Sequence, residues 1–99
     1  MGFAYIVVDA KEGKAFLVFE EIKMPGELRN VIQRGPIPHE IAAKPIQWGN
    51  KPAIELVPTC HPKGLCDVLY EELKDFAKRA GDTLRNPAEG YRRLKEAFP

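Results

Sequence analysis

The pattern of apolar and polar residues at the start of the chain predicts a β-hairpin. Two runs rich in β-branched and aromatic residues, 3–8 and 15–19, flank the polar segment 9–14, in which Gly13 has the expected left-handed position. Neither run alternates, so both faces of each strand are apolar, and such strands are usually covered on both faces. We therefore expect a central hairpin, with helices on one side and another layer or a partner subunit on the other.

A second hairpin is predicted in the middle of the chain. Residues 41–48 and 54–57 flank a turn at Gly49-Asn50, although a short helix over 38–44 is an alternative for the first part. Pro45 and Pro52 place this hairpin toward a sheet edge, because proline donates no hydrogen bond to a ladder.

The clearest helix runs from Pro62 or Leu65 to Ala80. One face of this segment is apolar at helical spacing, through Leu65, Leu69, Leu73, Phe76 and Ala80. Asp75 and Arg79 stand four residues apart and form an expected ion pair on the polar face. Gly81 is a natural stop for the helix.

Two shorter helices complete the expected elements. Pro25 and Gly35 bracket one over about 25–34. The order Asn86-Pro87-Ala88-Glu89 is that of a capped start, with asparagine at the cap, and a final short helix follows it. Together the elements predict one α+β domain over 1–99. Its antiparallel sheet has about four strands in the order ββαββαα, and the 65–80 helix packs across it.

Composition narrows the function classes. The net charge of +1 provides no global field that would favour nucleic acid or an anionic membrane, although residues 78–99 are mildly basic. The longest apolar run, 3–8, has six residues, so we expect no signal peptide and no membrane span. Two cysteines do not make a disulfide scaffold, so we expect a cytoplasmic protein with reduced thiols. The chain contains no serine, which excludes a serine nucleophile.

The segment 59–67 holds the first candidate chemistry, a metal site. Its candidate ligands are Cys60, His61 and Cys66, with His39 or Asp67 as the fourth, and thiolate and imidazole suit zinc. Five residues separate the two cysteines and no second pair exists, whereas structural zinc sites use closely spaced pairs. We expect no cofactor, with a divalent zinc or magnesium ion as the alternative.

The same cysteines have other interpretations. Cys66 falls in the first helical turn near Lys63 and His61, where the helix dipole lowers a thiol pKa, and is therefore a candidate reactive thiol. Alternatively, Cys66 packs as a small hydrophobe beneath the helix and Cys60 lies at a strand end.

A third candidate depends on a resemblance. The stretch from His39 to Asn50, followed by 54–61, resembles the core of HNH (ββα-metal) nucleases, in which a hairpin leads through a histidine into a helix. Ala42-Ala43 stand where that family has its histidine pair. The resemblance therefore implies a nuclease domain that lacks its general base, with Ala43 and His61 as the candidate catalytic positions and His61 as metal ligand.

A weaker nuclease pattern lies after the first hairpin. Glu21-Ile22-Lys23, with Asp9 at the end of the first strand, places an acid and a lysine on one side of a strand, as restriction-type nucleases require. The alternative is a solvated strand end.

The remaining candidates are partner contacts. Arg92, Arg93 and Lys95 in the basic C-terminal stretch, together with Trp48, are candidate contacts for nucleic acid or for an acidic protein surface. Because no complete catalytic set and no phosphate loop is found, the leading hypothesis is a small non-enzymatic protein-interaction module, regulatory or inhibitory. We expect a protein partner or a homodimer, with weak nucleic-acid contact as an alternative, and no membrane partner.

Overall fold

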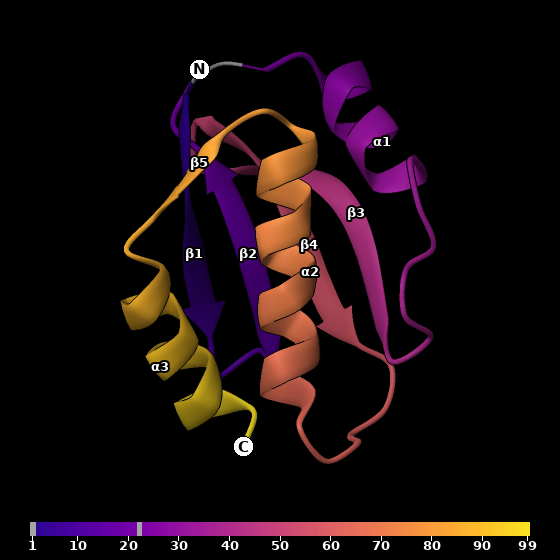
Figure 1. The fold of residues 1–99 in the computed structure, drawn as a ribbon, viewed down its shortest axis with the longest axis vertical. Coiled ribbons are helices and arrows are strands. Elements are labelled where there is room, and N and C mark those ends of the chain that lie inside the picture. The colour runs from indigo at the N-terminus through magenta and orange to yellow at the C-terminus, as the bar shows by residue number, and fades with distance from the viewer. Residues whose placement is uncertain (1, 22) are drawn as a thin grey trace.

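The computed structural model describes residues 2–21 and 23–99, which form one sheet with helices packed on it (Figure 1). The sheet has five strands in the spatial order β3-β4-β2-β1-β5. The strands are β1 (Phe3–Asp9), β2 (Lys14–Phe19), β3 (Ile41–Trp48), β4 (Lys51–Pro58) and β5 (Thr83–Arg85), and the helices are α1 (Pro25–Gln33), α2 (Leu65–Arg79) and α3 (Pro87–Ala97). The expected α+β class is confirmed.

The first hairpin lies inside the sheet, as its apolar sequence predicts. β1 pairs with β2 from Ala4 opposite Phe19 to Asp9 opposite Lys14, and β4 pairs with the other side of β2. Gly13 in the connecting turn has a φ of 68°, the left-handed conformation expected there.

The sheet is mixed, because β5 adds to the free side of β1 in the parallel sense. Its three residues, Thr83–Arg85, are too few to show a strand pattern, so the expected four antiparallel strands become five strands of mixed sense. Gly81, with a φ of 79°, ends α2 and turns the chain back along β1. The Thr83 N–H then donates to the Gly2 carbonyl at 2.9 Å, so tertiary pairing makes this segment a strand.

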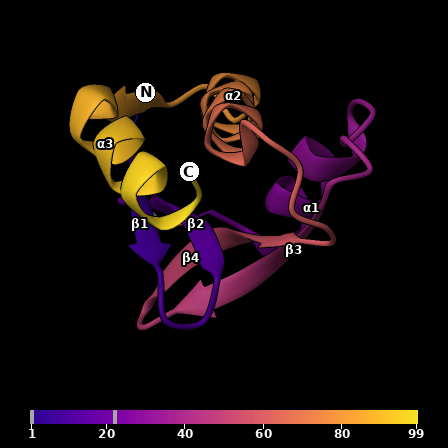
Figure 2. The same cartoon turned by 90° about the horizontal axis from the view of Figure 1, so that it is seen from below.

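All three helices of the described chain cover the same face of the sheet (Figure 2). The apolar face of α2 supplies Leu69, Leu73 and Phe76, which are fully buried in one cluster with Leu17 and Phe19 of β2. Full burial of an apolar side chain of this size stabilises a fold by about 1.5–3 kcal/mol, so this helix–sheet contact is a main source of stability.

Proline interrupts the outer edge of the sheet, as the sequence predicts for β3. Just before this strand, the Thr59 N–H donates to the Glu40 carbonyl at 2.8 Å. In an antiparallel ladder, even-numbered residues of β3 therefore bond toward β4, and odd-numbered ones, including Pro45, point their backbone outward. Pro45 has no N–H to offer an added strand, which blocks strand addition at the middle of this edge. The alternative helix over 38–44 is wrong, since the strand begins at Ile41.

α3 lies close to β1 because one of its positions is glycine. A Cβ added at Gly90 would lie 2.8 Å from Ile6 Cδ1, a separation that only glycine permits without movement of the strand side chain. The expected side-chain cap of α3 is wrong. Asn86 occupies the N-cap position, but its φ of 47° is left-handed rather than extended, and its side chain makes no capping bond.

Two buried acids on the helix side have different partners. Asp82 pairs with Lys23, whose Nζ lies 3.1 Å from Asp82 Oδ1. Glu72 of α2 is only 9% exposed, and its Oε2 has no hydrogen-bond partner among the described residues. Burial raises the pKa of Glu72 above its ordinary value, and the opposing attraction of Arg79 is smaller. The ionised form of Glu72 therefore destabilises the fold at neutral pH.

We expect Glu72→Gln to stabilise the protein at pH 7 and to have little effect at pH 4. A carboxyl whose pKa is raised by folding contributes stability below its unfolded pKa of about 4.3 and loses it as the pH rises through the folded value. Removing the charge should add about 1 kcal/mol at pH 7, or about 4–8 °C in Tm.

Thermal unfolding followed by circular dichroism at the two pH values measures this effect. Glu71→Gln, at the exposed neighbouring position, is the matched control and should change Tm little. A Tm for Glu72→Gln that is lower than that of the wild type at pH 7 would contradict the assignment.

Candidate binding surface

The sheet face opposite the helices carries a second, smaller apolar cluster. Its buried members are Phe16, Val18 and Ala53, which are 8%, 0% and 0% exposed, with Tyr5, Val7 and Ile46 packed around them. No helix or strand of the described chain lies over this face (Figure 2). The side chains of the strands themselves therefore shield the cluster, and the second layer that the hairpin sequence predicts is not supplied by the described residues.

A buried carboxylate with two lysines lies in the middle of this uncovered face. Glu55 is 4% exposed, and the Nζ atoms of Lys14 and Lys44 lie 3.0 Å and 3.3 Å from its two carboxylate oxygens. Burial alone would raise the pKa of Glu55, but the hydrogen bonds and charges of the two lysines together outweigh it and lower the pKa below its ordinary value. The negative charge of Glu55 is thus compensated within the face.

One end of the uncovered face carries exposed rings and cations, which we call the aromatic strip: Trp48, Lys51, Tyr5, Phe3 and Arg85. Trp48 stands opposite Lys51 in one strand pair, and Tyr5 opposite Arg85 in another. Lys51 Nζ lies 5.5 Å from the centroid of the Tyr5 ring, and Arg85 Cζ lies 3.9 Å from that of Phe3. Phe3 and Trp48 are 40% and 38% exposed, so the strip offers apolar rings to solvent beside positive charges.

A pocket of about 430 Å³ opens at the end of the strip, where β1, β5 and α3 meet; we call it the edge pocket. Its lining includes three cations, Lys51, Arg85 and Arg93, and two carboxylates, Glu20 and Glu89, so three positive and two negative charges leave +1. Each carboxylate pairs with one of the two arginines in the lining. Glu20 Oε1 lies 2.9 Å from Arg85 Nε, and Glu89 Oε1 lies 3.0 Å from Arg93 Nη2.

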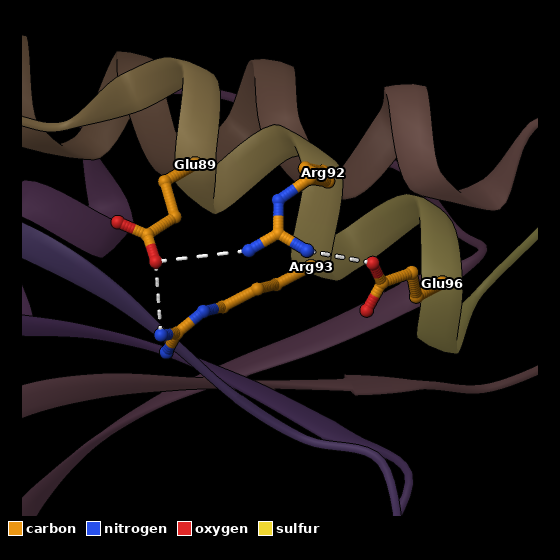
Figure 3. A network of polar contacts seen from close by, with 4 residues as sticks. All are labelled: Glu89, Arg92, Arg93 and Glu96. Atoms are coloured by element: carbon orange, nitrogen blue, oxygen red, sulfur yellow. Dashed lines mark hydrogen bonds and ion pairs between the residues drawn. The ribbon is translucent and has the colours of Figure 1, made fainter.

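The arginines of α3 differ in their surroundings, although they are adjacent in sequence (Figure 3). Glu89 Oε1 contacts both, at 3.7 Å for Arg92 and 3.0 Å for Arg93, and Arg92 also pairs with Glu96 at 2.8 Å. Arg93 lines the edge pocket, whereas Arg92 and the exposed Lys95 do not. Of the four predicted partner contacts, the structure thus places Trp48 on the strip and Arg93 in the pocket beside it.

The candidate metal ligands are placed differently from one another. Cys60, His61 and His39 are exposed, whereas Cys66 is buried. The Thr59 hydroxyl donates to the His39 carbonyl at 2.6 Å, so the two loops are adjacent. Within residues 2–21 and 23–99, however, no three His, Cys, Asp or Glu residues are grouped so that they could hold a metal ion. The Asp67 carboxylate instead accepts a hydrogen bond from the Tyr91 hydroxyl at 2.7 Å.

Cys66 packs into the core at the start of α2, as the alternative interpretation predicts. It is 4% exposed, and its thiol donates to the Tyr91 carbonyl at 3.9 Å. Burial, followed by the nearby Asp67 charge, raises the pKa of the Cys66 thiol. The expected lowering of the thiol pKa is therefore wrong, because loss of water on burial is the largest influence on this thiol.

The residues of the nuclease resemblance do not share a pocket. The hairpin β3–β4 followed by α2 has the element order that the resemblance implies. Ala43, however, packs against the helix-side core, while Ala42 is exposed on the other face. His61 is exposed and lines a pocket that contains neither of these two alanines. The other residues of this pocket are Ala10, Gly13, Pro62, Leu65, Ala97, Phe98 and Pro99. A histidine in place of Ala43 would enter the core.

Lys23 and Asp9, two residues of the predicted restriction-type nuclease pattern, bond to other residues of the fold rather than to each other. Ile22 lies outside the described residues, and β2 ends at Phe19, so Glu21 and Lys23 follow the strand. Lys23 pairs with Asp82, and Asp9 accepts a hydrogen bond from the Glu12 N–H at 3.0 Å within its own turn.

Sequence reasoning did not single out most of the aromatic strip. Phe3 and Tyr5 stand far from Lys51 and Arg85 in the sequence, and only the sheet order makes them neighbours. The available signal was the run 3–8, which is apolar at every position although only one face meets the helices.

Comparison of the chain with protein-family models, with curated proteins and with solved structures finds no match. No helix in the described part of the chain is long and apolar enough to cross a membrane.

We expect Glu55→Gln to destabilise the protein at pH 7, by about 1–3 kcal/mol, because its hydrogen bonds to the lysines lose their charge. A carboxyl whose pKa is lowered by folding contributes stability above its unfolded pKa of about 4.3 and loses it as the pH falls through the folded value. The difference from wild type should therefore shrink below about pH 4. Urea unfolding over a pH series measures it, with the exposed Glu12→Gln as control. A difference independent of pH would refute the charge argument.

Proposed function

We propose that this chain is a small non-enzymatic module that binds single-stranded nucleic acid on the uncovered face of its sheet. The observation that carries the proposal is the aromatic strip, in which exposed rings and cations lie side by side on a face with no covering element in the described chain. Proteins that bind single strands with little sequence preference combine these two features, because bases stack on rings and cations hold the phosphates.

The rings of the strip suit flat ligands. Trp48 offers an exposed indole, and the Arg85 guanidinium over Phe3 provides a second planar surface on which a base can stack. Base stacking on an aromatic side chain contributes about 1–3 kcal/mol for each base. Trp48 and Phe3 together can therefore hold a short strand with modest affinity, and a net charge of +1 agrees with weak rather than tight binding.

The charges of the face favour a polyanion. At the centre of the face, the Lys44 and Lys14 side chains are 67% and 36% exposed, whereas the Glu55 side chain, which pairs with both, is 5% exposed. The outward potential of the central face is therefore positive. A phosphate backbone matches this arrangement, and the strand can lie across neighbouring strands of the sheet.

The sequence favoured a protein partner or a second copy, but the geometry gives these less support. A standard protein interface buries about 800 Å² on each side around a largely apolar centre. The three residues at the centre of the uncovered face, Phe16, Val18 and Ala53, are already buried in the monomer, so they gain little from a partner. Two copies packed face to face would also bring like-charged lysines together, and Pro45 interrupts strand addition at the β3 edge.

Titration with an oligothymidylate of about twelve nucleotides tests the proposal. Trp48 is the only tryptophan in the chain, so its fluorescence reports contact directly and should be quenched on binding. We expect Trp48→Ala to weaken binding about tenfold, measured by fluorescence anisotropy of labelled oligonucleotide, because one stacking surface is lost. Met24→Ala is the matched control, since Met24 is 65% exposed and lies at the start of α1, away from the strip.

Two outcomes would overturn the proposal. The first is oligonucleotide binding that Trp48→Ala and Met24→Ala weaken equally, which would place the contact elsewhere. The second is no oligonucleotide binding. If light scattering then shows a dimer that Trp48→Ala dissociates, the strip is a protein interface instead.

A further inference from the structure

We infer that the edge pocket between β1, β5 and α3 holds a phosphate group of the bound strand. This inference rests on the proposed function and assigns part of that surface a specific chemistry. The pocket and the strip are continuous, because Tyr5, Lys51 and Arg85 belong to both. A strand whose bases stack on the rings of the strip therefore brings its backbone to the mouth of the pocket.

The cations of the pocket are held in position before any ligand binds. Glu20 engages Arg85 through Nε, and Glu89 engages Arg93 through Nη2. A guanidinium has further N–H groups in the same plane, so each arginine can still donate to a phosphate oxygen. Side chains that are already ordered lose less conformational entropy on binding.

The position of Arg93 depends on the close approach of α3 to the sheet. Gly90 brings the helix backbone against Ile6, and Arg93 follows one turn later on the helix and lines the pocket. The first turn of α3 also borders the pocket, through Glu89 and Gly90. The three cations exceed the two carboxylates, so the pocket attracts one anionic group more strongly than a cation.

The pocket volume of about 430 Å³ exceeds that of a bare phosphate and falls within the range of about 300–1,000 Å³ typical of small-ligand sites. It therefore has room for the sugar attached to the phosphate. The phosphate can be an internal phosphodiester or a terminal monophosphate, and both present the same oxygens to the arginines.

The adjacent arginines of α3 allow a matched test. Arg93→Gln and Arg92→Gln remove the same charge from the same helix, and both residues contact Glu89, but only Arg93 lines the pocket. We expect Arg93→Gln to weaken binding of the oligothymidylate about tenfold and to reduce the slope of log affinity against log salt by about one. Arg92→Gln should change affinity less than about twofold. Equal effects of the two variants would overturn the inference.

The carboxylate next to Arg93 provides a test of opposite sign. Glu89→Gln removes a negative charge from the pocket lining, while the amide oxygen of glutamine can still accept a hydrogen bond from Arg93 and keep it in place, so this variant should tighten binding severalfold. Weaker binding by Glu89→Gln would contradict a phosphate in this pocket. Oligonucleotides with a 5′-phosphate, a 3′-phosphate or neither distinguish a terminal from an internal phosphate, since only a terminal site prefers one phosphorylated end.

Inorganic phosphate separates failure of the inference from failure of the proposed function. In NMR titrations of the ¹⁵N-labelled wild-type protein, we expect saturable shifts of the Glu89 and Gly90 amides that Arg93→Gln abolishes. These shifts without oligonucleotide binding would support the pocket and overturn the proposed function. Oligonucleotide binding that quenches Trp48 and is insensitive to Arg93→Gln would overturn the pocket alone.

Discussion

The packing of α2 and its neighbouring helices on one face of β2 is the contact on which the rest of the structure depends. The helices direct their largest apolar side chains to that face, where Leu73 and Phe76 meet Leu17 and Phe19. Because all three helices lie on this side, the opposite face must stabilise itself with its own side chains. A small cluster around Phe16 and the pairing of the buried Glu55 with two more exposed lysines do so, and Phe3 and Trp48 at the end of that face are left exposed to solvent.

Three buried acids differ in whether a lysine compensates their negative charge. Glu55 and Asp82 each meet lysine, and the pKa of Glu55 is lowered in spite of its burial. Glu72 meets no such partner among the described residues, and its pKa is raised. The compensated acid on the uncovered face keeps the potential there positive, whereas the uncompensated one is confined to the helix side, away from the proposed nucleic-acid surface.

The proposed binding surface is a product of how residues 81–99 return to the sheet. Gly81 reverses the chain after α2, β5 pairs with β1 and brings Arg85 beside Tyr5, and Gly90 lets α3 approach Ile6 closely. The basic C-terminal stretch thereby becomes one wall of a pocket instead of a solvated tail. Of the two adjacent arginines of α3, Arg93 lines the pocket, whereas Arg92 pairs with Glu96 outside it.

The sequence by itself determined the helices and the two hairpins, because local periodicity, turn glycines and prolines act over a few residues. For Cys66 it left three interpretations open, of which the structure selects burial in the core. It also indicated that the first hairpin is apolar on both faces. Only the tertiary structure decided that β5 is a strand, that Asn86 makes no cap, and that Trp48 and Arg93 border one continuous surface. These features depend on pairing between segments far apart in the chain, and a local pattern carries no information on which distant segments will meet.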